Sequence, residues 1–303
     1  MRTRLNRALL LVAISATSVH AQMPDDGLML PRGTVMSGAF YSHDAWDQYW
    51  EGTLKRSNGN IGTLTTRAIT WVAGYAVADR LNVTAAVPYI WTHASQGVLH
   101  DMSGLQDLTA AAKYRLLSRS IGGHGVLSTF IAGAAALPMG HYSPDFMPLS
   151  IGTGGSRASA RLTIDYDATS PWFATASGAY TFCNNVRLNR DSYFTNGQLY
   201  LTNEVAMPNV IDYTVTAGMA RGAWRLPLSL TRQLTLGGSD IRRQDMPFVS
   251  DRMDFVRLAA GAMYAPRAFR GFSLHASAAH VLNGRNVGQS TTITSGLMYA
   301  LHR

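Results

Sequence analysis

The feature that most constrains the fold of this sequence is an alternation of polar and apolar residues. In the stretch SGLQDLTAAAKYRLL, residues 103–117, Asp107, Lys113 and Arg115 alternate with apolar residues such as Tyr114. A period of two places successive side chains on opposite faces of a β-strand. This pattern fits a soluble β-sandwich, whose apolar faces form a core, and it equally fits a membrane barrel, whose apolar face meets lipid. The rest of the chain has to distinguish these two folds.

Composition favours the membrane barrel. Charged residues make up only 15% of the 303 residues, against roughly 25% in soluble domains. The mean hydropathy of −0.01 excludes a polytopic helical membrane protein but fits a barrel, in which polar and apolar positions cancel. Beyond the first 21 residues, no stretch reaches the roughly 18 apolar residues that a membrane-spanning helix needs.

The first 21 residues have the organisation of a secretory signal peptide. Three arginines precede an apolar stretch at residues 8–17, and Ala21 suits signal peptidase. We therefore expect residues 1–21 to be removed and residues 22–303 to form one barrel in the outer membrane. The leader arginines account for part of the formal net charge of +8, and the remaining charge is too diffuse to indicate nucleic acid. Cys183 is the single cysteine, which excludes an intramolecular disulfide.

Turn signals divide the chain into twelve predicted strands. Short connections are expected at residues 77–80, 118–123, 167–171, 220–223 and 266–271. Longer Gly-, Pro- and Asn-rich connections are expected at residues 43–61, 94–103, 138–154, 184–207, 237–250 and 283–289. Short turns at one end and long loops at the other are typical of outer-membrane barrels. The predicted strands cover residues 33–42, 62–76, 81–93, 104–117, 125–137, 156–166, 172–182, 209–219, 224–236, 253–265, 272–282 and 291–301.

Most predicted strands alternate cleanly, with three departures. Residues 125–137 are apolar almost throughout. Residues 251–258 lose phase, which indicates a β-bulge. Arg232 falls on the apolar face of its strand, and we expect it to lie close to the outer headgroups.

Aromatic residues on the apolar phase fall into two sets, one at each end of the strands. Residues expected near the short turns or the C-terminus are Tyr75, Tyr114, Tyr166, Tyr264 and Tyr299. Residues expected near the long loops are Tyr89, Trp91, Tyr180 and Phe182. Two such girdles flank the apolar band of a membrane barrel. A soluble core would not sort its aromatic residues by strand parity, so this pattern favours an all-β, antiparallel, up-and-down transmembrane barrel.

The polar phase carries eight charged residues that are candidates for lining the lumen. They are Asp107, Lys113, Arg115, Arg157, Arg161, Asp165, Asp212 and Arg225. Opposite charges across a narrow pore would create a transverse field that orients polar solutes. Alternatively, the charges pair and brace or plug the lumen, as side chains fill eight-stranded barrels. For residues near the short turns we favour bracing, because the planar fork of arginine suits paired carboxylates.

Part of the sequence resembles a known family. The stretch TWVAGYAVADRLNVTAAVPYI, residues 70–90, and the following SGLQDLTAAAKYRLL carry its motifs. The matching positions are Gly74, Tyr75, Asp79, Arg80, Leu81, Pro88, Tyr89, Ser103, Gly104, Asp107, Leu108, Lys113, Tyr114, Arg115 and Leu116. They are similar to a bacterial outer-membrane family described as transporters of the meta-pathway of phenol degradation, although Gln106 stands where that family usually has glycine. The resemblance implies a barrel that moves small, often aromatic or hydrophobic, compounds across the outer membrane.

Three functions are open to such a barrel. The first is a passive, porin-like channel for uptake of small molecules, without a cofactor. The second is a structural or adhesive barrel with a plugged lumen. The third is a lipid hydrolase at the lipid-facing rim, which would need a Ser–His pair there. His275 and Ser277 share a strand face, but the alternation turns that face to the lumen, so we do not expect an enzyme.

The expected partners follow from the barrel. They are outer-membrane lipid and lipopolysaccharide, small-molecule solutes, and the barrel-assembly machinery, which usually reads a terminal aromatic residue that this chain lacks. The loop histidines His43, His93, His100 and His141 show no HxH or HExxH spacing, so no metal site is expected. The stretch HDAWDQYW, residues 43–50, is interpreted either as a lip that collects aromatic solutes or as a loop packed against the rim.

Overall fold

The computed structural model describes residues 23–242 and 247–302. The expected leader at residues 1–21 therefore lies outside the described residues.

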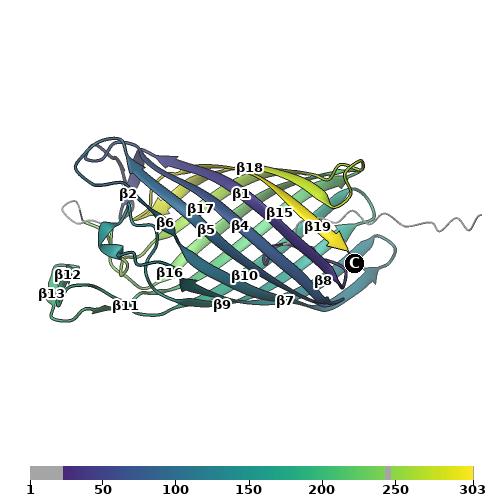
Figure 1. The fold of residues 1–303 in the computed structure, drawn as a ribbon, viewed down its shortest axis with the longest axis horizontal. Coiled ribbons are helices and arrows are strands. Elements are labelled where there is room, and N and C mark those ends of the chain that lie inside the picture. The colour runs from purple at the N-terminus through teal and green to yellow at the C-terminus, as the bar shows by residue number, and fades with distance from the viewer. Residues whose placement is uncertain (1–22, 243–246, 303) are drawn as a thin grey trace, which may run out of the picture.

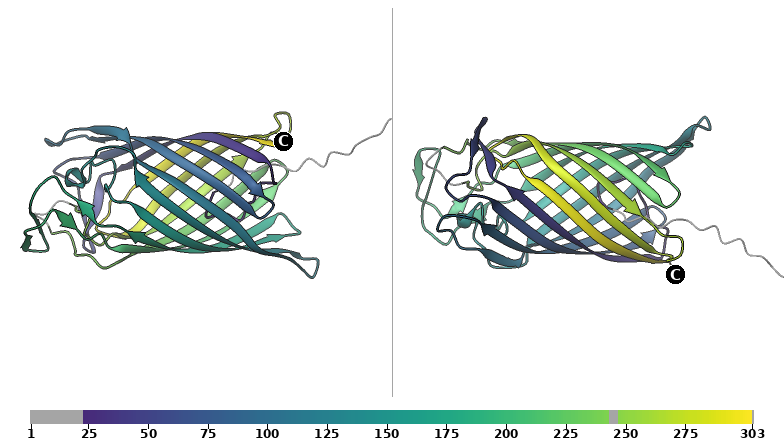
Figure 2. Two further views of the ribbon diagram at one scale, coloured as in Figure 1. Left: turned by 60° about the horizontal axis from the view of Figure 1, so that its bottom comes forward. Right: turned by 90° about the horizontal axis from the view of Figure 1, so that it is seen from above.

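Twelve long antiparallel strands form a closed barrel in the described part of the chain (Figure 1). In chain order they are β1 (Thr34–Trp46), β4 (Leu64–Ala78), β5 (Leu81–Ala94), β7 (Asp107–Ile121), β8 (Gly125–Pro138), β9 (Arg157–Ala168), β10 (Trp172–Cys183), β15 (Asn209–Arg221), β16 (Trp224–Leu236), β17 (Asp254–Tyr264), β18 (Phe272–Arg285) and β19 (Thr291–His302). Each strand pairs with its neighbours in the chain, and Figure 2 shows their common tilt around the barrel. The all-β barrel and its strand order confirm the sequence prediction.

The first and last strands close the barrel. β1 pairs with β19 in a continuous register from Thr34↔His302 to Ala45↔Thr291, and its other edge pairs with β4. Closure pairs the backbone groups of every spanning strand, which is what the hydrocarbon of a membrane requires.

Short turns lie at one end of the barrel and long loops at the other (Figure 1). The loop end carries short elements that the sequence analysis did not predict. They are β2 (Gln48–Glu51), β3 (Leu54–Ser57), β6 (Met102–Leu105), the 3₁₀ turn η1 (Pro144–Phe146), β11 (Val186–Arg187), β12 (Tyr193–Thr195), β13 (Gln198–Tyr200) and β14 (Glu204–Val205). No helix within residues 23–242 and 247–302 is long and apolar enough to span a membrane.

The stretch at residues 43–50 packs against the rim. β1 continues to Trp46, so the predicted start of the loop at residue 43 was wrong. Trp50 of β2 is buried, and its ring lies against Gly284 of β18, where even a Cβ atom would not fit. Trp46 lies equally close to Gly288. These contacts agree with the interpretation of the stretch as a packed loop.

The apolar surface of the barrel faces outward. In β16, Leu226, Leu228 and Leu230 are exposed on the outward face. Arg225, on the opposite face of the strand, points inward and is buried. The same inversion recurs around the barrel and excludes the soluble sandwich, whose large apolar side chains would be buried. Arg232 is exposed on the outward face, four residues before the outer end of β16.

Four irregularities interrupt the hydrogen-bond ladder of the barrel. The register shifts between Val256 and Arg257, where the loss of alternation predicts a bulge. Shifts at residues 76–78 and 115–117 were not predicted. A break at Gln106 separates β6 from β7, opposite Pro88 of β5, which has no N–H to donate. Gln106 N–H instead donates to the Pro88 carbonyl at 2.9 Å.

Candidate functional site

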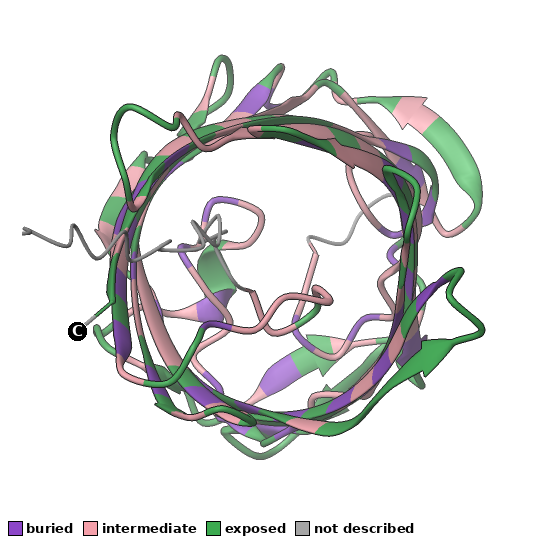
Figure 3. Ribbon diagram, turned by 90° about the vertical axis from the view of Figure 1, so that its right-hand side faces the viewer, coloured by how far each residue is buried: buried purple, intermediate pink, exposed green. Residues whose placement is uncertain are grey.

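The interior of the barrel is partly filled by the segment that precedes β1, residues 23–33, hereafter the N-terminal segment. Figure 3, a view along the barrel, shows chain inside the ring of strands. Contacts with inward-facing side chains of the strands place the N-terminal segment there. The lumen is therefore the candidate functional site, and its open part is what the segment leaves free.

Lys113 of β7 anchors the N-terminal segment. Its Nζ forms an ion pair with the Asp26 carboxylate at 2.8 Å and donates to the carbonyl oxygens of Met23 and Leu28, each at 3.1 Å, and to that of Asp26. The ammonium shares its three N–H donors among these four acceptors. It also lies 4.9 Å from the centre of the Phe130 ring. The Lys113 side chain is only 3% exposed, and a cation buried to that degree needs such partners.

Gly27 fits against the wall of the barrel because it has no side chain. A Cβ atom at this position would lie 2.0 Å from Cγ of Asp165 in β9. Asp165 is itself buried and accepts a hydrogen bond from Oγ1 of Thr175 in β10 at 2.5 Å. The close approach of backbone to carboxyl therefore fixes the position of the N-terminal segment along the lumen.

Leu30 secures the other end of the N-terminal segment. It is buried in a cluster with Met36, Val72, Ala76 and Met298, which face inward from β1, β4 and β19. These apolar residues depart from the polar lining expected of a barrel interior. They provide an apolar socket for Leu30 near the short-turn end.

A cavity of about 300 Å³ remains beside the N-terminal segment. Its polar wall consists mostly of hydroxyl groups and its apolar wall includes Phe173, Pro227 and Met263. The lining residues are Met23, Asp25, Asp26, Gly27, Leu28, Phe173, Thr175, Ser177, Thr214, Thr216, Arg225, Pro227, Ser229, Thr231, Arg257, Ala259, Met263 and His275. A mixed wall of this kind can hold a small molecule with one apolar and one polar side.

Two arginines of the lumen are fixed by neighbours on other strands. Nη2 of Arg161 pairs with Asp212 at 2.8 Å, and its Nη1 donates to Ser177. Arg225 is buried with its guanidinium carbon 3.5 Å from the centre of the Phe173 ring, a cation–π stack. Its nearest acidic group is Asp167, at 3.8 Å.

Hydrogen bonds join the loop between β8 and β9 to the barrel at its long-loop end. Asp107, buried at the start of β7, accepts from Nη2 of Arg157 at 2.5 Å and from the hydroxyl of Tyr142 in the loop before β9. Burial and the hydrogen bond to Asp107 raise the pKa of Tyr142, so its hydroxyl keeps its proton at a pH at which a free tyrosine would lose it. The Gln106 side chain donates to the Ile151 carbonyl of the same loop at 2.6 Å.

Arg115 differs from the other charged candidates. Its Nη2 donates to the backbone carbonyl of Asp79, in the turn between β4 and β5, at 3.0 Å. This turn belongs to the short-turn end of the barrel, so the side chain of Arg115 reaches that end, and a bulge follows directly after the residue. The structure thus brings Asp107 to Arg157 and Arg161 to Asp212, whereas Lys113 and Asp165 contact the N-terminal segment.

The aromatic residues of the two sets lie on the outer surface. Those with exposed side chains are Tyr75, Tyr89, Trp91, Tyr114, Tyr180, Phe182 and Tyr299. Tyr166 and Tyr264 are half-buried. The Tyr166 hydroxyl donates to the His124 carbonyl, and Tyr264 packs on Trp224 with the ring centres 4.6 Å apart.

Sequence analysis missed the N-terminal segment, and with it Asp26 and the hydroxyl-lined wall. The available signal was the pair Asp25–Asp26 before a glycine, which lies outside every predicted strand. His275, weighed for a rim hydrolase, lies in the cavity wall 3.0 Å from the Ser273 hydroxyl, away from the lipid-facing surface. In the described part of the chain no group of three His, Cys, Asp or Glu side chains could hold a metal ion.

The fold and the lumen define a class of protein, the transmembrane β-barrels of the outer membrane, which agrees with the expected location. Among solved structures, the chain is similar to the COG4313 outer membrane channel from Pseudomonas putida F1, with a TM-score of 0.71 and 16% identity over 93% of this chain and 100% of that one. A TodX deltaS2S3 mutant monoaromatic hydrocarbon channel follows at a TM-score of 0.48 and 10% identity, over 90% of this chain and 91% of that one. The NanC porin gives 0.46 and 7%, over 86% and 100%. No protein-family model and no curated protein sequence matches the chain.

Proposed function

We propose that this protein is a passive outer-membrane channel for small molecules, and that its solutes are compounds with an aromatic or otherwise apolar part. The observation that carries the proposal is the 300 Å³ cavity between the N-terminal segment and the wall formed by β10, β15, β16 and β17. Its volume and mixed lining suit a small solute, and diffusion down a gradient needs no cofactor.

The size of the cavity supports a solute of one ring. A dry cavity of about 150 Å³ can hold benzene. The cavity here is about 300 Å³ and so has room for a ring with a polar substituent. Phe173 and Met263 would contact the ring, and the hydroxyl groups of Thr214 and Thr216 would meet the substituent.

Two resemblances support the proposal of a channel for small molecules. The motifs at residues 70–90 and 103–117 resemble the family described as transporters of the meta-pathway of phenol degradation. The structural neighbour from Pseudomonas putida F1 is described as an outer membrane channel. We propose that this chain shares the channel activity of that neighbour and the solute class of that family.

A second candidate is a barrel whose lumen stays plugged. The anchoring of the N-terminal segment by Lys113 favours a plugged lumen, because the ion pair with Asp26 and three further hydrogen bonds hold the segment in place. In that case the outer loops would be the functional part, and the barrel would conduct neither ions nor solutes.

A pair of adjacent alanines provides a test of the channel proposal. Ala259 lines the cavity, whereas Ala260 is exposed on the outward face of the same strand. We expect Ala259→Trp to slow the swelling of proteoliposomes in phenol-type solutes at least about fivefold, because the indole fills most of the cavity. Ala260→Trp should leave the rate unchanged.

The outcomes separate the candidates. If wild-type protein shows no swelling and no single-channel conductance, the plugged barrel is correct. If Ala259→Trp and Ala260→Trp conduct and transport alike, solutes do not pass through this cavity.

A further inference from the structure

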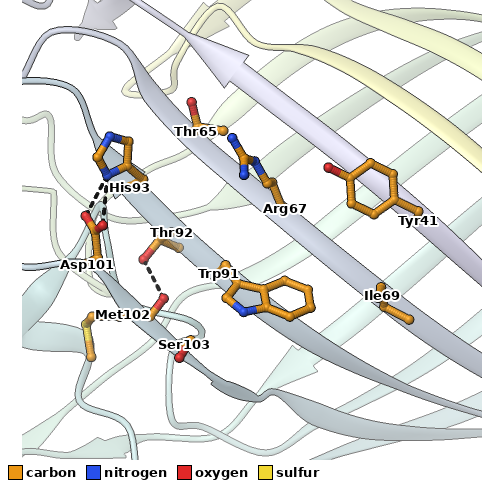
Figure 4. Close-up of a pocket in the computed structure, with 10 residues that line it drawn as sticks. All are labelled: Tyr41, Thr65, Arg67, Ile69, Trp91, Thr92, His93, Asp101, Met102 and Ser103. Carbon is orange, nitrogen blue, oxygen red and sulfur yellow. Dashed lines mark hydrogen bonds and ion pairs between the residues drawn. The ribbon is translucent and has the colours of Figure 1, made fainter.

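A second pocket lies on the outer surface of the barrel, at the loop end, and the proposed channel does not use it. Figure 4 shows its lining on β1, β4, β5 and β6. It has a volume of about 620 Å³. The lining residues are Tyr41, Thr65, Arg67, Ile69, Trp91, Thr92, His93, Asp101, Met102 and Ser103. We call it the outer pocket.

Strand register arranges the outer pocket in two rows. The inner row, farther from the loops, is apolar and aromatic, because Tyr41 lies opposite Ile69, which lies opposite Tyr89. The next row toward the loops is basic and polar, with Arg67 between His43 on β1 and Trp91 on β5. The surface therefore changes from apolar to basic over one step of two residues.

Arg67 is a cation on the apolar face of a membrane strand. Its neighbours on that face, Ile69 and Trp71, are exposed apolar side chains. Arg67 is itself exposed, and within residues 23–242 and 247–302 it makes no ion pair. An unpaired arginine on the lipid face of a barrel is costly at the midplane and becomes tolerable near the headgroups. It stands three residues inside the end of β4, or about 10 Å along the strand, and it pairs across the sheet with Trp91 of the aromatic set at the loop end.

The carboxylate of the outer pocket, Asp101, is paired with His93 and not with Arg67. Asp101 accepts from Nδ1 of His93 at 2.8 and 2.9 Å. Dashed lines in Figure 4 join Asp101 to His93 and Thr92 to Met102, and none reaches Arg67. Thr65 and Ser103 add neutral hydroxyl groups. Among the described residues no acceptor is bound to the Arg67 guanidinium, which is exposed on the outer surface and can donate to an anion.

We propose that the outer pocket binds a phosphorylated lipid of the outer leaflet, with Arg67 on the phosphate of a lipid A headgroup. The guanidinium fork matches two phosphate oxygens, a geometry that a single point charge lacks. The acyl chains of the same lipid would lie on the apolar row of Tyr41, Ile69 and Tyr89. Trp91, with its ring centre 4.8 Å from that of Tyr89, would stand at the boundary between headgroup and chains. The inference rests on the orientation of the barrel and is independent of what the lumen transports.

Lipid binding to purified full-length protein in detergent tests this inference. The probes are bis-phosphorylated lipid A and the same lipid A with both phosphates removed, titrated and counted as bound lipid by native mass spectrometry. We expect wild-type protein to bind the phosphorylated lipid about tenfold more tightly, and Arg67→Gln to lose that preference. Arg232→Gln, which removes another outward-facing arginine on the loop side but outside the outer pocket, should retain it.

The same titrations can overturn the inference. Equal affinity of wild-type protein for the two lipids would exclude phosphate recognition, and this arm does not depend on any variant folding. Equal losses in Arg67→Gln and Arg232→Gln would mean that basic residues attract the lipid without a defined pocket. Single-channel conductance of Arg67→Gln should equal that of wild-type protein, and a change would instead connect the outer pocket to transport.

Discussion

Lys113→Met is the substitution that would most directly release the N-terminal segment. Methionine fits the space of the lysine stem but removes the charge that contacts Asp26 and three backbone carbonyls. Removing one partner of a buried ion pair costs about 3–5 kcal/mol. The lower value applies here, because the side chain of Asp26 is 26% exposed. A loss of about 3 kcal/mol lowers the docking equilibrium of the segment more than about a hundredfold.

The expected result is a wider and more variable pore. Single-channel recordings of Lys113→Met should show a larger mean conductance than wild-type protein and frequent transitions between conductance levels. Hydrogen exchange of the backbone amides of residues 23–30 should become faster. Asp26→Asn keeps the three backbone carbonyls and an amide oxygen as acceptors for the Lys113 ammonium, so its effect should be smaller, about 1.5–3 kcal/mol, the value of a hydrogen bond to a charged group. Unchanged conductance and unchanged protection in Lys113→Met would refute the anchoring role, and equal effects of the two substitutions would assign all of it to the ion pair.

Three further perturbations probe other contacts. Gly27→Val should also displace the N-terminal segment, since its Cβ atom would lie 2.0 Å from Cγ of Asp165, and limited proteolysis near residue 27 should become faster; wild-type resistance would contradict this close approach. Arg161→Glu should shift the reversal potential toward cation selectivity in bilayer recordings, and an unchanged potential would argue that this residue does not line the conduit. The hydrogen bond from Arg285 lowers the pKa of Asp240, so this contact stabilises the outer loops above a pH of about 4 and is lost as the pH falls through the lowered value. Acid-induced loosening of the loops, measured by hydrogen exchange, should therefore be weaker in Asp240→Asn than in wild-type protein. Identical pH profiles of the two proteins would contradict a stabilising role of the Arg285–Asp240 contact.

Alternation and turn chemistry predicted most of the barrel. Residues 224–236 were predicted as a strand and form β16 with the same bounds, because polar and apolar residues alternate there between clear turn signals. Residues 104–117 were predicted as one strand and are broken at Gln106. That break depends on Pro88 of the neighbouring strand, and no single-strand pattern contains this information.

The candidate site was less accessible to sequence analysis. Alternation indicates that Lys113 faces the lumen, but its acidic partner is 87 residues away and outside any periodic segment. Met36 and Met298 face inward and pack against Leu30. The expectation that a barrel interior is lined by polar residues does not predict this apolar contact. A strand pattern specifies which way a side chain points, whereas its partner depends on the closed structure.

The pairing of β1 with β19 has a consequence for synthesis of the protein. The two halves of this seam lie at opposite ends of the polypeptide, from Thr34↔His302 to Ala45↔Thr291, so the barrel cannot close before the last strand has been made and delivered. A chain terminated before residue 291 would present two open sheet edges to hydrocarbon, each with a row of backbone amides and carbonyls that no solvent there can satisfy. Loss of the chain from residue 291 onward should therefore abolish insertion altogether, even though residues 291–302 are not among those that line the cavity or the outer pocket.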